Sequence, residues 1–366
     1  MSRVYLDWNA TTPPHPEVIV AMERALVDGW GNPSSVHARG REARRVVEDL
    51  REAIAARTRA HPRDVIFTSG GTEANNLALA SATALALGRH EHPSVLRPAE
   101  RLAAAGASVT WLEVGESGRV EEAALEQGLV DLPRGATVAL MAANHETGVL
   151  QPLDAARRAV ERTAAWLHVD AVQAFGKVDS AFEAAHSVAL SAHKIQGPKG
   201  IGALVWRRSP AALAPLIAGG GQERGLRGGT LDGVAAAGFL AAVNLVHPDA
   251  YAHLATLRDE LERALGDVAR VNGSGPRLPH VSNLSFEGAR GDELVVALDL
   301  LGIEVSAGSA CSAGSQEPSA VVRAMAGEDR ARQAVRFSMG PVTTREAVLQ
   351  AIAALRRVLT RRSSSG

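Results

Sequence analysis

The sequence predicts an α/β protein with a large domain built on a mainly parallel sheet and a smaller α+β domain. Short apolar runs alternate with helix-like segments from about residue 17 to residue 246, which is typical of a doubly wound sheet with helices on both faces. After about residue 250 this alternation gives way to a mixed order of helices and strands. We therefore expect a large domain over residues 15–250 and a small domain formed by residues 1–14 and 251–366.

The individual elements follow from the apolar periodicity and the turn residues. In the large domain, strands are predicted at residues 65–68, 108–114, 137–142, 166–170 and 188–190. Residues 83–89 fit either the end of a helix or a further strand. In the small domain we expect helices over 251–265 and 292–301, strands over 280–286 and 335–338, and a last helix from residue 344. Residues 361–366 are expected to be disordered.

Composition and charge exclude several classes of protein. The net charge of the 366 residues is −1, so charge gives no reason to expect nucleic acid or an anionic membrane as a partner. The longest uncharged apolar run, residues 233–246, is shorter than the ~18 residues of a membrane helix, and the N-terminus does not resemble a secretory signal. The single cysteine excludes an internal disulfide and a cysteine-rich metal site. We expect a cytoplasmic protein without a metal site.

Four strand ends carry residues suited to ligand binding. They are Thr68-Ser69-Gly70-Gly71-Thr72, Asn144-His145-Glu146, Asp170-Ala171-Val172-Gln173 and Ser191-Ala192-His193-Lys194. Ligands of open parallel sheets bind beyond the carboxyl ends of the strands. The first segment also places glycines and a hydroxyl at a helix N-terminus, where a phosphate is favoured. Taken alone, this segment fits ordinary helix capping better.

Taken together, these segments fit pyridoxal 5'-phosphate. Alone, Asp170 could equally be a capping or surface aspartate, and Lys194 would ordinarily be a solvated loop lysine. Combined, the segments supply a lysine for a Schiff base, a carboxylate for the pyridine nitrogen and donors for the phosphate. Only Lys177, Lys194 and Lys199 occur in the chain, so few amines compete for the role.

Cys311 is the one candidate for thiol chemistry. A lone cysteine is more often a small buried apolar residue. This one lies in the run SAGSACSAGS, which has no large apolar neighbour. The setting favours an accessible, mobile loop and a reactive thiol over a buried structural cysteine.

The sequence resembles the NifS/IscS-type cysteine desulfurases of the class V aminotransferase group, which are fold-type I pyridoxal-phosphate enzymes. The resemblance spans nearly the whole chain. It rests on the order and spacing of these runs: LDWNATTP, GNPSSVH, FTSGGTEANN, EHPSV, NHETG, HVDAVQ, SAHKIQGPKGIGAL, GGGQERGLRGGT, SNLSF, SAGSACSAGSQEPS and VRFSMG.

The resemblance implies a role for each matching residue. Lys194 would hold the cofactor as a Schiff base, His92 would stack on its ring and assist proton transfers, Asp170 would pair with the ring nitrogen, and Gln173 would donate to the ring hydroxyl. Gly71, Thr72, Ser191 and His193 would bind the phosphate. Thr230 would reach the phosphate of a neighbouring subunit, which implies a homodimer. Arg336 would bind the substrate carboxylate as a bidentate fork.

The same resemblance implies the reaction. L-cysteine would be converted to L-alanine, and its sulfur would be carried as a persulfide on Cys311 to an acceptor protein. Iron–sulfur assembly, tRNA thiolation and other sulfur metabolism all remain open as the destination. An iron–sulfur scaffold is in doubt as the partner, because the C-terminal extension with which some members dock it is not found after the last helix.

Two residues depart from the family pattern. His145 stands where the family usually has asparagine, near the ring oxygen and the substrate carboxylate. Gln222 stands where the glycine-rich segment usually has histidine. We expect His145 to contact cofactor and substrate, and the effect of Gln222 stays open.

Two other functions are compatible with parts of this sequence pattern. Another pyridoxal-phosphate enzyme of this fold, such as a selenocysteine lyase, a C–S lyase or an epimerase, would share Lys194 and Asp170 but would not need Cys311. A non-catalytic sulfur-carrying or scaffold protein would hold no cofactor at all.

Overall fold

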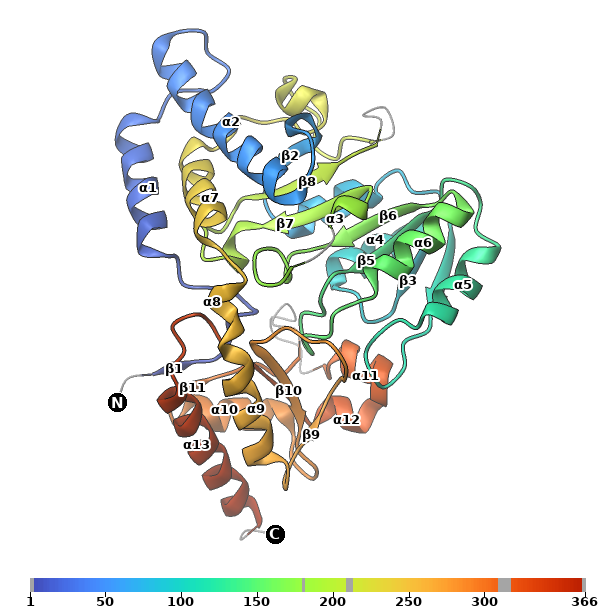
Figure 1. The fold of residues 1–366 in the computed structure, drawn as a ribbon, viewed down its shortest axis with the longest axis vertical. Helices are drawn as coiled ribbons and strands as arrows, with labels where there is room; N and C mark the ends of the chain where they lie inside the picture. The colour runs from blue at the N-terminus through green and yellow to red at the C-terminus, as the bar shows by residue number, and fades with distance from the viewer. Residues whose placement is uncertain (1–2, 180–181, 209–212, 309–316, 364–366) are drawn as a thin grey trace.

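The fold is known from a computed structural model, which describes residues 3–179, 182–208, 213–308 and 317–363. Figure 1 shows a larger part around a twisted sheet and a smaller part below it, which holds the C-terminal helix. The mixed α/β architecture with a mostly parallel large sheet confirms the predicted fold class. Among the described helices, none combines the length and apolar character that crossing a membrane requires.

The large sheet brings most strand ends to one edge. Its strands are β2 (Val65–Thr68), β3 (Ala84–Gly88), β4 (Ser108–Leu112), β5 (Thr137–Met141), β6 (Trp166–Asp170), β7 (Ser187–Ser191) and β8 (Gly202–Trp206), in the order β2-β8-β7-β6-β5-β3-β4. Strand β8 runs antiparallel to both β2 and β7, and the other neighbours are parallel. Strand β2 therefore points the same way as β7, and every strand except β8 ends at the same edge.

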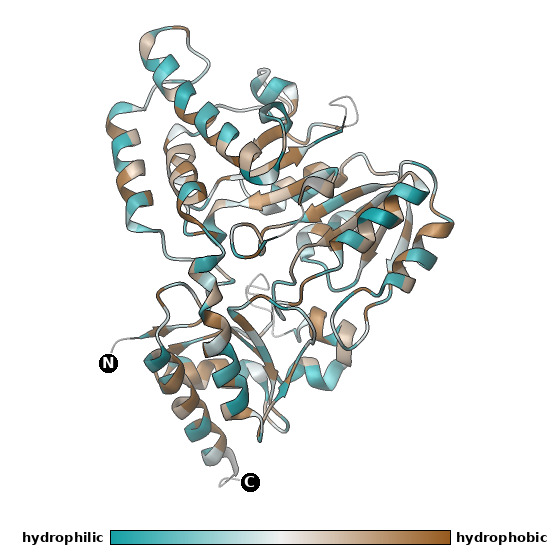
Figure 2. Ribbon diagram, viewed as in Figure 1, coloured by the Kyte–Doolittle hydropathy of each residue, from teal (hydrophilic) through white to brown (hydrophobic). Residues whose placement is uncertain are grey.

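Helices cover both faces of this sheet. They are α1 (Pro16–Asp28), α2 (Ala38–Thr58), α3 (Gly71–Leu79), α4 (Pro93–Ala104), α5 (Glu122–Val130), α6 (Leu153–Thr163) and α7 (Gly233–Leu245). Alternate residues of a strand point to opposite faces. Leu85 and Leu87 accordingly pack with Val95 of α4, whereas Ala86 belongs to the main core. In Figure 2 the strands are mostly brown and α2 carries long stretches of teal, as expected for a buried sheet and an outer helix.

The smaller part combines a three-stranded antiparallel sheet with helices. Its elements are α8 (Asp249–Ala252), α9 (Leu254–Leu265), β9 (Arg270–Val271), β10 (Val281–Ser285), α10 (Gly291–Asp299), β11 (Ile303–Glu304), α11 (Ala320–Ala326), α12 (Glu328–Arg332), β12 (Ala334–Ser338) and α13 (Arg345–Ser363), with the sheet order β12-β10-β9. The N-terminal strand β1 (Val4–Tyr5) pairs in parallel with β11. Asp7 then forms a bridge with Ser338, so the start of the chain is joined to this part.

Several boundaries differ from the sequence-based expectation. Residues 84–88 form a strand, which resolves the open choice at 83–89. The helix expected over 251–265 is broken at His253 into α8 and α9. Helix α13 continues through residue 363, so the disorder expected from residue 361 is wrong for residues 361–363. The helix packs on α9 and α10, and this packing supports a longer helix than the polar tail sequence suggests.

Candidate active site

A cavity of about 170 Å³ lies at the carboxyl edge of the large sheet, where the N-terminal segment and β12 meet it. Its lining includes every site residue predicted from the sequence except Cys311 and Thr230: Gly71, Thr72, His92, His145, Asp170, Gln173, Ser191, His193, Lys194 and Arg336. These residues therefore gather at the edge where the parallel strands end, which is where such sheets bind ligands.

The two exceptions lie elsewhere. Cys311 is outside the described residues. Thr230 is exposed and lines a separate cavity of about 140 Å³, which shares no lining residue with the first. Nearby, the side chain of Gln222 accepts a hydrogen bond from the Gly229 amide at 3.1 Å. Gln222 thus closes the glycine-rich loop before Thr230.

Asp170 is held as a hydrogen-bond acceptor at the end of β6. Its Oδ2 accepts from Asn75 Nδ2 at 2.8 Å, and its Oδ1 accepts from the Val172 amide at 3.0 Å. Behind it, His168 Nε2 lies 3.0 Å from Asn75 Oδ1, and burial lowers the pKa of His168 to about 4. Since Asn75 presents its oxygen there, the neutral imidazole donates from Nε2. This chain of hydrogen bonds keeps the carboxylate aimed at the cavity.

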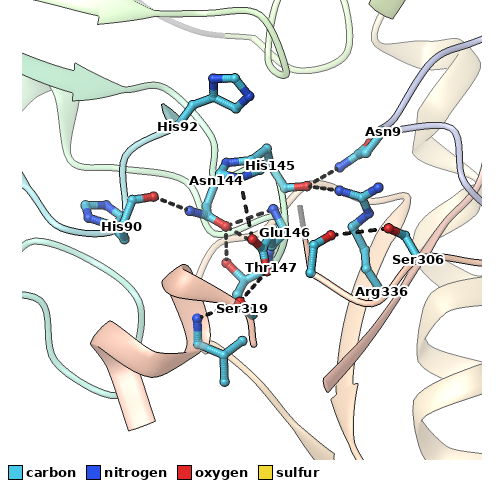
Figure 3. Close-up of polar contacts among 12 residues, drawn as sticks. Asn9, His90, His92, Asn144, His145, Glu146, Thr147, Ser306, Ser319 and Arg336 are labelled. Atoms are coloured by element: carbon cyan, nitrogen blue, oxygen red, sulfur yellow. Dashed lines mark hydrogen bonds and ion pairs between the residues drawn. The ribbon is translucent and has the colours of Figure 1, made fainter. Parts of the chain in front are cut away.

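Two imidazoles meet edge to face in the cavity wall. The rings of His92 and His145 lie 5.1 Å apart at 78° (Figure 3). His92 caps α4, where its Nδ1 accepts from the Ser94 amide at 3.1 Å, so the ring proton resides on Nε2. Burial is the main cause that lowers the pKa of both histidines, and that of His145 falls well below its usual range. Both rings are therefore neutral at neutral pH.

His145 offers unused hydrogen-bonding capacity. Its side chain is buried, and neither ring nitrogen has a hydrogen-bond partner among the described residues. Its Nε2 lies 3.6 Å from Glu146 Oε1, and burial raises the pKa of that carboxyl. Glu146 in turn accepts a hydrogen bond from Ser319, the N-terminal cap of α11 (Figure 3). The Asn-His-Glu segment thus links the sheet edge to the smaller part.

Lys194 lines the same cavity. It ends the 3₁₀ turn η3 (Ala192–Lys194) that follows β7. Its Nζ donates to the backbone oxygens of Asn9 and Ala10, the latter at 2.8 Å. The Asn9 oxygen also accepts from Gln173 Nε2 at 3.0 Å. The N-terminal segment therefore positions both side chains.

The start of α3 forms one end of the cavity. No side chain caps this helix, so its first backbone amides are available to an anion. A Cβ atom on Gly71 would come within 2.6 Å of Val172 Cγ2, so only glycine allows this close approach. Ser191 lines the same cavity, as does His193. The charge of Lys194 reinforces burial in lowering the pKa of His193 to about 3, which leaves a neutral imidazole beside this end.

Arg336 reaches the cavity from β12. Its Nη2 donates to Asp7 Oδ1 at 2.6 Å. Its Nη1 donates to the His145 oxygen at 3.1 Å (Figure 3). The Nε–H of this buried side chain has no partner among the described residues. The guanidinium is thus held by one carboxylate while N–H groups remain for an anionic ligand.

The sequence reasoning missed the residues that hold this set in place: Asp7, Asn9, Asn75 and Ser94. Asn75 gave a usable signal, because it lies among Ala74, Leu77 and Ala78 on the buried side of α3, and a polar residue there needs partners. Asn9 gave no signal beyond its place in the matching run LDWNATTP, because the residues with which it forms these hydrogen bonds lie at least 136 positions away.

The donor set suits an aromatic nitrogen heterocycle that carries an aldehyde and a phosphate. A carboxylate, a lysine and an uncapped helix start face one cavity, and unpartnered donors of His145 and Arg336 remain. The described residues contain no cluster of His, Cys, Asp or Glu that could hold a metal ion.

Comparisons with known proteins agree with this arrangement. The family "Aminotransferase class-V" matches residues 4–350. A protein named cysteine desulfurase from Frankia sp. (strain EuIK1) is 40% identical, covering 98% of this chain and 91% of the relative. Among solved structures, a "NIFS-LIKE PROTEIN" superimposes with a TM-score of 0.90 at 31% identity over 98% of this chain and 99% of its own. The structure "SspA in complex with cysteine" gives 0.81 at 32% identity over 93% and 99%.

Proposed function

The chain belongs to the class-V aminotransferase family, and we propose that it is a cysteine desulfurase that converts L-cysteine to L-alanine and passes the sulfur to an acceptor protein. The main observation in support is that Lys194, Asp170, His92 and Arg336 line one cavity. Relatives of the chain are named cysteine desulfurases. The solved relative that holds cysteine supports the choice of substrate.

The proposed cofactor is pyridoxal 5'-phosphate, which when bound acts as an electron sink for bonds at the α-carbon of an amino acid. Lys194 would hold it covalently, and Asp170 would keep its ring nitrogen protonated. Gln173 would donate to its ring oxygen, with His145 beside it. Phosphate binding is assigned to Gly71, Thr72, Ser191 and His193 at the start of α3, and to Thr230 of a second subunit.

The remaining residues would handle the substrate. The Arg336 guanidinium, already fixed by Asp7, would bind the α-carboxylate, and His145 would border the same carboxylate. His92, neutral with its proton on Nε2, would donate and recover a proton above the ring. The thiolate of Cys311 would form a bond to the substrate sulfur as the Cβ–S bond breaks. The sulfur then remains on the enzyme as a persulfide, and the carbon skeleton leaves as alanine.

A burst experiment tests this assignment. With cysteine and no acceptor, alanine should appear at about one equivalent per subunit and then slow, because a persulfidated nucleophile cannot attack again. Added reductant should accelerate the slow phase. Cys311→Ser should keep the cofactor spectrum and release little alanine. If the serine variant makes alanine and sulfide at the wild-type rate, a plain lyase is the better assignment.

The proposal includes a homodimer, a cytoplasmic location and the division into residues 15–250 against residues 1–14 and 251–366. The exposed Thr230, which lines its own cavity rather than that of Lys194, supports a site shared between subunits. The acceptor could serve iron–sulfur assembly or another sulfur pathway. A pull-down with the persulfidated enzyme would identify it.

A further inference from the structure

Lys177 is a buried cation that the proposed reaction does not use. It follows β6 in a series of turns, and 2% of its surface is exposed. No described carboxylate lies within ion-pair distance of it. Burial, reinforced by the charges of Lys194 and Arg336, lowers the pKa of Lys177 to about 7. A lysine in this position costs stability, so its presence calls for a reason other than the fold.

The contacts of Lys177 point to one neighbour. Its Nζ donates to Gln173 Oε1 at 3.3 Å, and the ring of Tyr251 from α8 lies 5.9 Å from the Nζ. The His280 ring packs on Tyr251 at 5.1 Å. Of these groups only Gln173 both receives a hydrogen bond from Lys177 and lines the cavity.

The two partners of Gln173 fix the direction of its amide. A lysine amine offers N–H donors in either protonation state, so the atom that faces it is the amide oxygen. A backbone carbonyl only accepts, so the atom that faces Asn9 O is the amide nitrogen. One N–H of Gln173 is thereby used, and the other remains for a ligand in the cavity. Without Lys177, the buried oxygen would lose its donor.

We propose that Lys177 is a positioning residue that holds Gln173 with its NH₂ group toward the cavity, so that this group recognises an oxygen acceptor on the cofactor ring. The inference rests on the proposed function, because it takes pyridoxal phosphate as the ligand. It assigns no contact between Lys177 and that ligand.

A double-mutant cycle on the full chain tests this coupling. The dissociation constant of pyridoxal phosphate is measured by titrating the apoprotein of the wild type, Lys177→Met, Gln173→Ala and the double variant. Lys177→Met alone should weaken binding about tenfold, the usual effect of leaving a buried acceptor without its donor. In the Gln173→Ala background the same change should alter binding less than about twofold.

A second readout separates positioning from a structural role. The visible absorption band of bound cofactor should shift in the same direction in Lys177→Met and Gln173→Ala, with no further shift in the double variant. Lys177→Met should leave the unfolding midpoint of the apoprotein unchanged or raised, since it removes a buried charge. Lys177→Leu serves as a second neutral variant, and the exposed Lys199→Met is the matched control.

Several outcomes would overturn the inference. If Lys177→Met weakened cofactor binding equally in the wild-type and the Gln173→Ala backgrounds, Lys177 would act independently of Gln173. If Lys177→Met alone left the dissociation constant unchanged, Lys177 would not act on the site. Apoproteins of both neutral variants that fail to fold would assign Lys177 to the fold instead. If the wild type itself binds no pyridoxal phosphate, the proposed function fails first.

Discussion

Asn9 connects more of the site than any single strand end does. Its backbone oxygen accepts from both Lys194 and Gln173. Its side chain donates to the His145 oxygen at 3.0 Å and lies 3.1 Å from His280 Nε2. With 1% of its surface exposed, Asn9 has no water to replace these partners, so the geometry of the site depends on a residue that lies outside the strands and helices of the large sheet.

Arg336 gives a prediction about substrate affinity. Arg336→Lys keeps a positive charge near Asp7 but cannot form two parallel hydrogen bonds to a carboxylate. The KM for cysteine should rise by about tenfold to a hundredfold, while the absorption spectrum of the bound cofactor stays normal. Steady-state kinetics and a spectrum of the same sample check this. A colourless or aggregated variant would instead assign Arg336 to a structural ion pair with Asp7.

Lys177 gives a prediction about the pH dependence of stability. The unfolded chain keeps the Lys177 proton to about pH 10, whereas in the folded chain the pKa is lowered to about 7. Between these values the unfolded state binds more protons, so this group makes stability rise with pH. The free energy of unfolding of Lys177→Met should therefore exceed that of the wild type most near about pH 6, and this difference should disappear toward about pH 10. Urea unfolding of the apoproteins measures the difference, and a constant difference would contradict the lowered pKa.

Among the elements, α2 and the glycine-rich loop are joined by one buried ion pair. Arg51 of α2 donates to both carboxylate oxygens of Glu223, at 2.7 and 3.1 Å. Glu223 also accepts from the Phe67 amide of β2 at 2.9 Å. Both side chains are almost fully buried. Helix, strand and loop are thus fastened at one carboxylate, close to the loop that presents Thr230.

Glu223→Gln should destabilise the protein by about 3–5 kcal/mol, because it leaves the Arg51 charge buried without its counter-charge. Glu48→Gln is the matched control. Glu48 pairs with the same arginine at 3.2 Å but is half exposed, so its loss should cost at most about 1 kcal/mol. Denaturant unfolding of both variants measures the two losses of unfolding free energy. Equal losses would refute the stabilising role assigned to the buried pair of Arg51 and Glu223.

The sequence predicted those elements that local pattern determines. The strand predicted at 166–170 has the same bounds as β6. The apolar run ends at the carboxylate Asp170, which marks the end of the strand. Strand β8 was missed, since it follows a turn-rich segment and its antiparallel pairing comes from tertiary contact. For the site, the strand-end segments contain most of the predicted residues that line the cavity, whereas His92 and Arg336 came from the family resemblance. The orientation of Gln173 and the approach of Asn9 depend on segments distant in sequence, which no local pattern reveals.

At the scale of the whole molecule, the exposed apolar surface of α1 supports the proposed dimer. Leu26, Val27 and the following Trp30 are 63%, 73% and 68% exposed. Large apolar side chains gathered on one exposed segment are typical of an interface. Together with Thr230, which lies apart from the chain's own Lys194 cavity, they favour an assembly of two copies.

A mixing experiment tests the shared site. Thr230→Val and Lys194→Ala subunits should each bind pyridoxal phosphate weakly as homodimers. In a mixed dimer one site combines a native Lys194 with a native Thr230 of the partner, so tight binding should return at about one cofactor per mixed dimer. Titration after subunit exchange measures it. Tight binding by a wild-type sample shown to be monomeric would contradict the shared site.

The pairing of the chain's two ends also sets the order of events during synthesis. Asp7 and Arg336 are 329 residues apart, and among the described strands β1 pairs only with β11, which is translated nearly 300 residues later. Closing so long a loop has an entropic cost and cannot precede translation of its far end. A nascent chain can therefore complete its large sheet while the wall of the cavity is still missing. The large sheet can thus form during translation, and the complete binding cavity can form only after Arg336 has been translated.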